Sequence, residues 1–250
     1  KMNNYKTVFF AIGVLLIILG TFMLIPLFLQ FTYGEENKSF LSSTTITIFM
    51  GILLVLTNLE ENRKLNLQNA FLLTTLSWLS VAVFGCIPFL LSDLHLSFID
   101  SFFESMSGIT TTGATIITYL DDAPKSILIW RAILQWLGGI GIIVMAITIL
   151  PLLNIGGMQL FRMEGNETTE KILPKTREVT LIISIIYLAL TFFCGIAYWL
   201  VGMNIFDSIA HSMTTIATGG FSTYSDSIGH FENPKIEIIS ILFIILGSLP

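Results

Sequence analysis

The chain has 250 residues, of which 54% are hydrophobic and 12% are charged, and its formal net charge is −5. A soluble domain carries about a quarter charged residues, so this composition excludes an ordinary soluble protein and indicates an integral membrane protein. A mean hydropathy of +0.82 agrees with that class. Cys86 and Cys194 lie inside apolar stretches, which predicts packing residues rather than a disulfide or a metal site.

Six apolar stretches along the chain predict membrane helices. A helix of about 20 residues crosses the hydrocarbon core of a bilayer, and five stretches reach that length. They are 7–29, 40–59, 69–91, 125–153 and 178–201. The sixth begins near Pro234 and is cut off by the end of the printed sequence. The first stretch is too long for the core of a signal peptide, so we expect a retained helix.

Lysine and arginine residues gather before the first span, after the second, and between the fourth and fifth. They are Lys1, Lys6, Arg63, Lys64, Arg162, Lys171, Lys175 and Arg177. The positive-inside rule therefore predicts that this side, with the N-terminus, is cytoplasmic. The opposite side is rich in Asp and Glu. Such a surface either concentrates cations at a pore mouth or is an ordinary solvated rim, and charge count alone favours the rim.

A polar segment occurs twice between apolar stretches, at 100–115 and at 207–221. Each copy starts with Asp-Ser, and each contains Thr-Gly. The aspartates are 207 − 100 = 107 residues apart and the glycines 219 − 113 = 106, so we align the copies with one residue deleted. Each segment is too short to cross and precedes another span, which predicts a re-entrant loop. The expected parts are a short helix (101–109 or 208–216), capped by Asp100 or Asp207, and a Thr-Gly turn.

The repeated turns indicate an ion path. Non-helical backbone at membrane depth is tolerated only where it is buried in protein or lines a water-filled path. Rings of backbone carbonyl oxygens replace the hydration shell of K+ in channels, and Gly113 and Gly219 reach the unusual dihedrals without steric cost. The hydroxyls of Thr111, Thr112 and Thr218 can brace the loops. A single Thr-Gly pair is also a common turn, so it is the repetition that favours a pore.

Four stretches carry a resemblance to the Trk/Ktr/HKT superfamily of potassium transporters, and most closely to its TrkH-type subunits. They are SMSGITTTGAT at 105–115, WRAILQWLGG at 130–139, GGMQLFR at 156–162 and TIATGGFST at 215–223. The resemblance implies an all-α membrane protein in which four helix–pore loop–helix units, preceded by two extra helices, surround one pore. It also implies a homodimer in the bacterial plasma (inner) membrane, and a cytoplasmic nucleotide-binding subunit, a TrkA-like ring, that gates the pore.

The resemblance also implies the site residues and the division of the chain. It assigns a K+ selectivity filter to Thr111, Thr112, Gly113 and Ala114 in the first loop, and to Ala217, Thr218, Gly219 and Gly220 in the second. It divides the chain into two N-terminal helices (1–64), a first unit (65–155), a cytoplasmic connector (156–178) and a second unit (179–250). Because the printed sequence ends inside the second unit, we expect it to be the N-terminal half of a longer protein.

Two polar residues near the first loop leave alternatives open. Arg131 lies near the outer start of the fourth span. It either pairs with Glu104 or with carbonyl groups of the short helix and braces the filter, or extends to the membrane interface. His211 aligns with Glu104 and predicts a polar contact on the second short helix rather than a pH sensor.

We therefore expect a pore-forming subunit for K+ uptake that contacts membrane lipid, carries K+ as the transported ion and holds no covalent cofactor. The sequence has no nucleophile–base set or metal triad, so we do not expect an enzyme. Two alternatives are a Na+-permeable or cation-coupled carrier of the same fold and a non-conducting membrane scaffold. Glycine at both filter positions favours K+, because in the family a serine there is associated with Na+ permeation.

Overall fold

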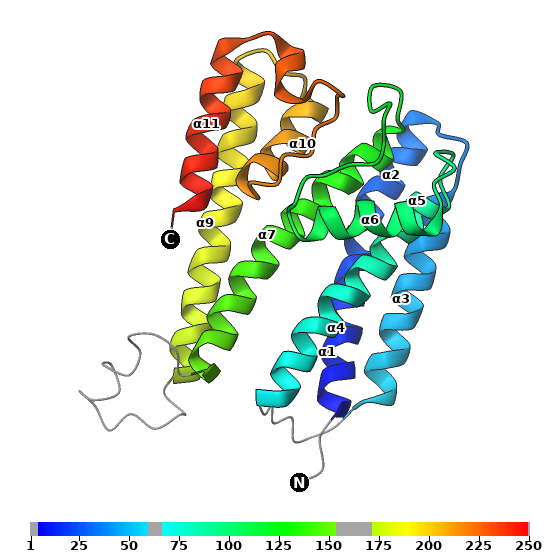
Figure 1. The fold of residues 1–250 in the computed structure, drawn as a ribbon, viewed down its shortest axis with the longest axis vertical. Coiled ribbons are helices and arrows are strands. Elements are labelled where there is room, and N and C mark those ends of the chain that lie inside the picture. Colours follow the sequence, from blue (N-terminus) through cyan, green and yellow to red (C-terminus); the bar gives the residue numbers. More distant parts are fainter. Residues whose placement is uncertain (1–4, 60–66, 154–171, 250) are drawn as a thin grey trace, which may run out of the picture.

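The computed structural model describes residues 5–59, 67–153 and 172–249, and all regular secondary structure in these ranges is helical (Figure 1). The elements are α1 (Tyr5–Phe22), α2 (Leu24–Tyr33), α3 (Ser39–Thr57), α4 (Leu67–Gly85), α5 (Ile87–Leu90), α6 (Phe98–Ile109), α7 (Lys125–Leu153), α9 (Ile172–Leu200), α10 (Ile205–Ile216), the 3₁₀ helix η2 (Ser227–Phe231) and α11 (Pro234–Ser248). The predicted all-α fold is confirmed.

Four predicted spans correspond to helices that are long and apolar enough to cross a membrane. Within the described residues these are Tyr5–Tyr33, Ser39–Thr57, Gln68–Leu90 and Glu178–Leu200. Helix α7 covers the predicted range 125–153, and α11 begins at the predicted Pro234. Helix α9 begins at Ile172, inside the predicted connector (156–178). Residues 154–171, which include the first part of that connector, lie outside the described residues.

Prolines explain why two of these spans are each divided into two helices. The ring of Pro26 removes the backbone donor that would bond to residue 22, where α1 ends. The chain nevertheless continues helically, because Met23 donates to Leu19 and Leu27 donates to Met23, both at 3.1 Å. Pro88 lies in the first turn of α5, directly after the break between α4 and α5, and it likewise lacks a backbone donor. Both spans therefore continue across the proline as one helical path.

Helix α7 lies between two groups of helices (Figure 1). On one side are α1, α3 and α4, and on the other are α9, α10 and α11. Glycines let α1 and α3 approach closely, since a Cβ added to Gly13 would lie 2.8 Å from the Gly51 carbonyl oxygen. Trp130 of α7 is fully buried, and its indole nitrogen donates to the Gly85 carbonyl oxygen at 2.9 Å. On the other side, the indole nitrogen of Trp136 donates to the Thr191 hydroxyl of α9 at 3.1 Å, so side chains of α7 reach both groups.

Candidate functional site

The two short helices, α6 and α10, have their N-caps three residues before the aspartates that we expected in that role. Their N-caps are Ser97 and Asn204. The Ser97 side chain accepts from the Asp100 backbone N–H at 3.2 Å, and the Asn204 side chain accepts from the Asp207 backbone N–H at 2.8 Å. The predicted N-cap assignment is therefore wrong. Both aspartates occupy the first turn instead, where the negative charge of a carboxylate interacts favourably with the positive end of the helix dipole.

Asp207 also holds the second loop. Its carboxylate is fully buried and accepts hydrogen bonds from the Thr223 hydroxyl at 2.7 Å and the Tyr224 hydroxyl at 2.9 Å. The chain beyond the Thr-Gly turn is thus tied to the start of α10. The Asp100 carboxylate instead accepts from the Ser97 hydroxyl at 2.7 Å, within its own helix cap. The buried Asp207 cannot belong to a solvated acidic rim.

The two loops have the same backbone conformation at a constant spacing. Thr111 and Thr218 have positive φ of 56° and 52°, and Gly113 and Gly220 both have φ of 79°. The spacings are 218 − 111 = 107 and 220 − 113 = 107. Our alignment with one deleted residue is therefore wrong, and the counterpart of Gly113 is Gly220 rather than Gly219. Left-handed φ is unusual for a β-branched residue such as Thr and is found mainly at functional sites.

The loops meet directly at two glycines. A Cβ added to Gly113 would overlap the Gly219 carbonyl oxygen, so only glycine permits this approach. The first and second predicted filter segments, although far apart in sequence, therefore lie side by side. The Thr112 hydroxyl shares a hydrogen bond of 2.8 Å with the Thr110 hydroxyl. Within the described residues, the hydroxyls of Thr111 and Thr218 make no hydrogen bond, so the predicted bracing holds for Thr112 alone.

Gln135 of α7 fixes the backbone of the second loop. Its side chain is fully buried. The amide nitrogen donates to the Gly219 carbonyl oxygen at 2.9 Å, and the amide oxygen accepts from the Phe221 backbone N–H at 3.0 Å. The sequence alone does not assign this role to Gln135. The only signal was a polar residue one helical turn after Arg131 within an apolar span.

Arg131 is 1% exposed, so the alternative in which it extends to the membrane interface is wrong. Its Nε lies 2.7 Å from Glu104 Oε1, which confirms the predicted ion pair. Its Nη1 donates to the Ser222 carbonyl oxygen at 2.7 Å, and the guanidinium lies 4.0 Å from the centre of the Phe221 ring. The carbonyl that Arg131 holds belongs to the second loop rather than to a short helix.

The side chains of Glu104 in α6 and His211 in α10 each form hydrogen bonds to the loop that follows their own helix, Glu104 through a carboxylate and His211 through an imidazole. The Glu104 carboxylate accepts from the Thr115 hydroxyl at 2.9 Å and from the Ile116 backbone N–H at 3.0 Å. His211 is 2% exposed, and its Nε2 lies 2.9 Å from the Ser222 hydroxyl. The predicted polar contact of His211 is confirmed. Glu104, like Asp207, is fully buried and lies outside any acidic rim.

The carbonyl oxygens of the two loops fall into two groups. Those of Ala114 and Gly219 accept hydrogen bonds from the Ser107 hydroxyl at 2.6 Å and from Gln135 at 2.9 Å. Across the part of the chain that the structure describes, no hydrogen bond uses the other carbonyl oxygens of the predicted filter. These belong to Thr111, Thr112, Gly113, Ala217, Thr218 and Gly220. Oxygen atoms without protein donors are suitable ligands for a dehydrated cation.

Comparisons with known proteins identify similar proteins over nearly the whole chain. The family model described as TrkH, cation transport protein, matches residues 36–249. Among curated proteins, the Trk system potassium uptake protein TrkH of Vibrio parahaemolyticus is 40% identical over 98% of this chain and 51% of its own length. TrkH of Escherichia coli K12 is 39% identical over 98% and 52%, and TrkI of Halomonas elongata is 37% identical over 100% and 51%.

A solved structure is also similar. The crystal structure of the potassium transporter TrkH from Vibrio parahaemolyticus superposes with a TM-score of 0.86 at 38% identity, over 97% of this chain and 49% of that chain. The chain spans about half the length of the curated relatives that it matches.

Proposed function

Because this chain belongs to the TrkH family of cation transport proteins, we propose that it forms half of a K+-selective pore whose filter is lined by backbone carbonyl oxygens. One observation carries the proposal. The loops at 110–115 and 217–222 have left-handed residues at equivalent positions, touch at Gly113 and Gly219, and keep most of their carbonyl oxygens free of protein donors. The relatives whose names specify potassium uptake support K+ as the ion.

The proposed chemistry is the replacement of water by fixed oxygen ligands. A K+ ion that enters the filter exchanges its hydration shell for carbonyl oxygens. The ends of α6 and α10 add partly negative carbonyl groups that favour a cation beside them. Glycines of the following helices pack against these ends, since a Cβ at Gly138 would overlap the Ile109 carbonyl oxygen, and one at Gly247 would lie 2.7 Å from the Ile216 carbonyl oxygen.

Side chains keep the filter in place while ions pass. Gln135 holds the Gly219 and Phe221 peptide groups, and Arg131 holds the Ser222 carbonyl oxygen. Both side chains come from α7, the helix that follows the first loop, whereas the groups that they hold belong to the second. In this proposal each loop is re-entrant and depends on the neighbouring unit for its shape.

The proposal extends to the parts of the protein that this chain does not contain. Two further helix–pore loop–helix units complete the ring of carbonyl oxygens around one axis. The protein lies in a bacterial inner membrane with its N-terminus in the cytoplasm, forms a homodimer, and is gated by a cytoplasmic nucleotide-binding subunit. The names of the relatives, which refer to a Trk system, support a multi-component assembly.

The test combines ion flux with direct location of the ion. The full-length protein in proteoliposomes should take up Rb+ in preference to Na+, and anomalous scattering from Rb+ should peak between the loops. Gly113→Ala should abolish selective uptake, because φ of 79° disfavours a side chain and the added Cβ overlaps the Gly219 carbonyl oxygen. Gly229→Ala is the matched control, since a Cβ there meets no atom within 4 Å.

Three results would contradict the proposal. Absence of Rb+ density beside the loops would remove the filter assignment, and equal Na+ and Rb+ uptake would favour the Na+-permeable alternative. A wild-type protein that shows no flux under any gradient, with its nucleotide-binding subunit present, would leave the scaffold alternative as the better explanation.

A further inference from the structure

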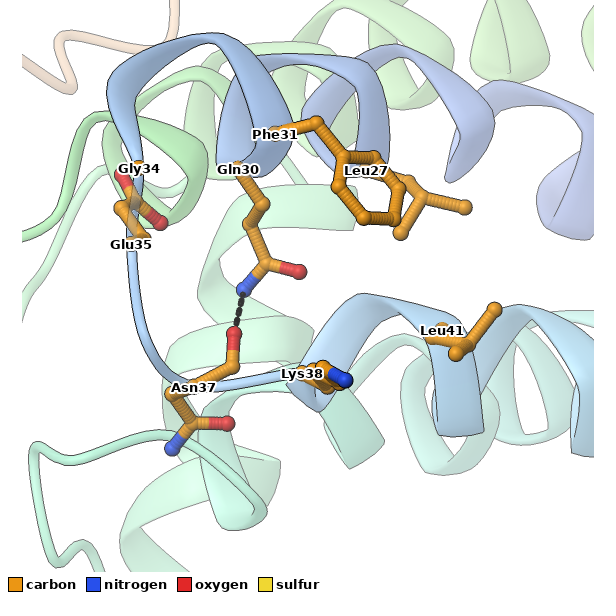
Figure 2. Close-up of a pocket in the computed structure, with 8 residues that line it drawn as sticks. All are labelled: Leu27, Gln30, Phe31, Gly34, Glu35, Asn37, Lys38 and Leu41. Atoms are coloured by element: carbon orange, nitrogen blue, oxygen red, sulfur yellow. Dashed lines mark hydrogen bonds between the residues drawn. The ribbon is translucent and has the colours of Figure 1, made fainter.

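Two carboxylates are fully buried among the described residues, and only one of them has a counter-charge. Glu104 forms an ion pair with Arg131, so these two charges cancel. Asp207 forms no ion pair with any cationic side chain that the structure describes. Glu35, in contrast, is a half-buried residue in the loop between α2 and α3 (Figure 2), where solvent screens its charge. The charge of Asp207 is neither paired in this way nor screened by solvent.

Neutral groups hold the Asp207 carboxylate in place. It accepts hydrogen bonds from the Thr223 hydroxyl at 2.7 Å, from the Tyr224 hydroxyl at 2.9 Å and from the side-chain amide of Asn204. Such bonds lower the cost of burying an anion, but they leave its net charge unchanged. Because a buried charge without a counter-charge is costly, the arrangement points to a cation in the proposed pore as the missing counter-charge.

The carboxylate lies close enough to the second loop to act on an ion there. Thr223 follows Gly220 by three residues, and an extended chain of that length spans at most about 11 Å. With the Thr223 side chain and its hydrogen bond added, the Asp207 carboxylate lies within about 16 Å of Gly220. At an effective dielectric constant of about 20, a unit charge at that distance changes the affinity for a monovalent cation about fivefold.

Asp207 also changes the electric field of α10. It occupies the first turn, where its charge offsets the partial positive charge, roughly half an elementary charge, of that helix end. The other end of α10, at Ile216, carries the partial negative charge and adjoins the second loop. The attractive end therefore acts on the loop without an opposing positive end. In the first unit the equivalent residue, Asp100, is half-buried, so solvent weakens the same effect.

We propose that the Asp207 carboxylate is a fixed charge that raises the affinity of the second loop for the transported cation. The inference rests on the proposed function, because it takes this loop as part of the filter. It extends that function by naming a residue outside the filter that acts on the ion through its charge rather than through contact. The hydrogen bonds that tie Asp207 to the chain after the loop are a separate, positioning role.

The test measures Rb+ uptake by the full-length protein in proteoliposomes, and its inhibition by Ba2+. Asp207→Asn removes the charge at nearly constant size, and it should raise the KM for Rb+ about fivefold. A divalent cation interacts twice as strongly with a fixed charge, so the Ba2+ concentration that halves uptake should rise by the square of that factor, about 25-fold. A change in the shape of the loop does not produce this relation between the two ions.

Three further variants separate the charge from the hydrogen bonds. Asp100→Asn is the matched control, because it removes the equivalent but half-buried charge of the first unit and should leave both constants near their wild-type values. Tyr224→Phe removes one hydrogen bond and keeps the Asp207 charge, so it should not show the squared relation. Tyr224→Lys keeps Asp207 and brings an ammonium to its carboxylate, so it should reproduce both shifts even if Asp207→Asn does not fold.

Each result has a defined meaning. Shifts of about fivefold for Rb+ and about 25-fold for Ba2+ in Asp207→Asn or in Tyr224→Lys, with Asp100→Asn close to wild type, support the proposal. Wild-type constants in a folded Asp207→Asn or Tyr224→Lys protein overturn it, and so does a Tyr224→Phe protein that reproduces both shifts. A wild-type protein without preference for Rb+ over Na+ would count against the proposed filter instead, so the two failures are distinguishable.

Discussion

Substituting Gln135 by leucine should open the second loop locally. The leucine side chain has nearly the same size, but it leaves the Gly219 carbonyl oxygen and the Phe221 backbone N–H without partners in a buried position. An unsatisfied buried group costs about 1–3 kcal/mol. We therefore expect the loss of the Phe221 N–H partner alone to lower the free energy of local opening by about 2 kcal/mol. At 1.4 kcal/mol for each factor of ten, local opening becomes about 30-fold more frequent.

The assay is amide hydrogen exchange at Phe221 in the full-length protein, which reports local opening directly. Gln135→Leu should accelerate exchange at Phe221 by about 30-fold and reduce the preference for Rb+ over Na+ in uptake. Gln68→Leu is the matched control, since Gln68 is an exposed residue near the start of α4. An unchanged exchange rate at Phe221 in Gln135→Leu would refute the conclusion that this side chain holds the loop.

Two further predictions concern the charged groups around the loops. Glu104→Leu leaves the Arg131 guanidinium buried without its carboxylate, which should destabilise the protein by about 3–5 kcal/mol. Adding Arg131→Met should restore most of the thermal stability. A double variant no more stable than Glu104→Leu would argue against the pairing. The Ser225 hydroxyl, 2.6 Å from the Asp121 carboxylate, lowers the pKa of Asp121. The stabilising contact between the segments that follow the two loops is therefore complete above the ordinary aspartate pKa and is lost as the pH falls through the lowered value. Ser225→Ala should raise the pKa of Asp121 in an NMR titration, and an unchanged titration curve would exclude the contact.

The sequence alone was sufficient for the membrane spans and for the repeat. The length and apolar character of a span are local properties, so residues 7–29 and 178–201 identified helices without any knowledge of their neighbours. The repeat was visible because residue types recur near a constant spacing. The alignment was off by one residue within the loops, however, because Thr-Gly letters match at Gly219 while the left-handed backbone matches at Gly220.

The tertiary structure decided which polar groups hold the loops. Sequence left Arg131 between two roles, and only the packing of α7 beside α6 and the second loop places its guanidinium against Glu104 and the Ser222 carbonyl oxygen. The role of Gln135 had no local signal, since its partners lie 84 and 86 residues further along the chain. Hydrophobic length is set by the residues of one helix, whereas a buried hydrogen bond requires two segments to be brought together, and that depends on how all the helices pack.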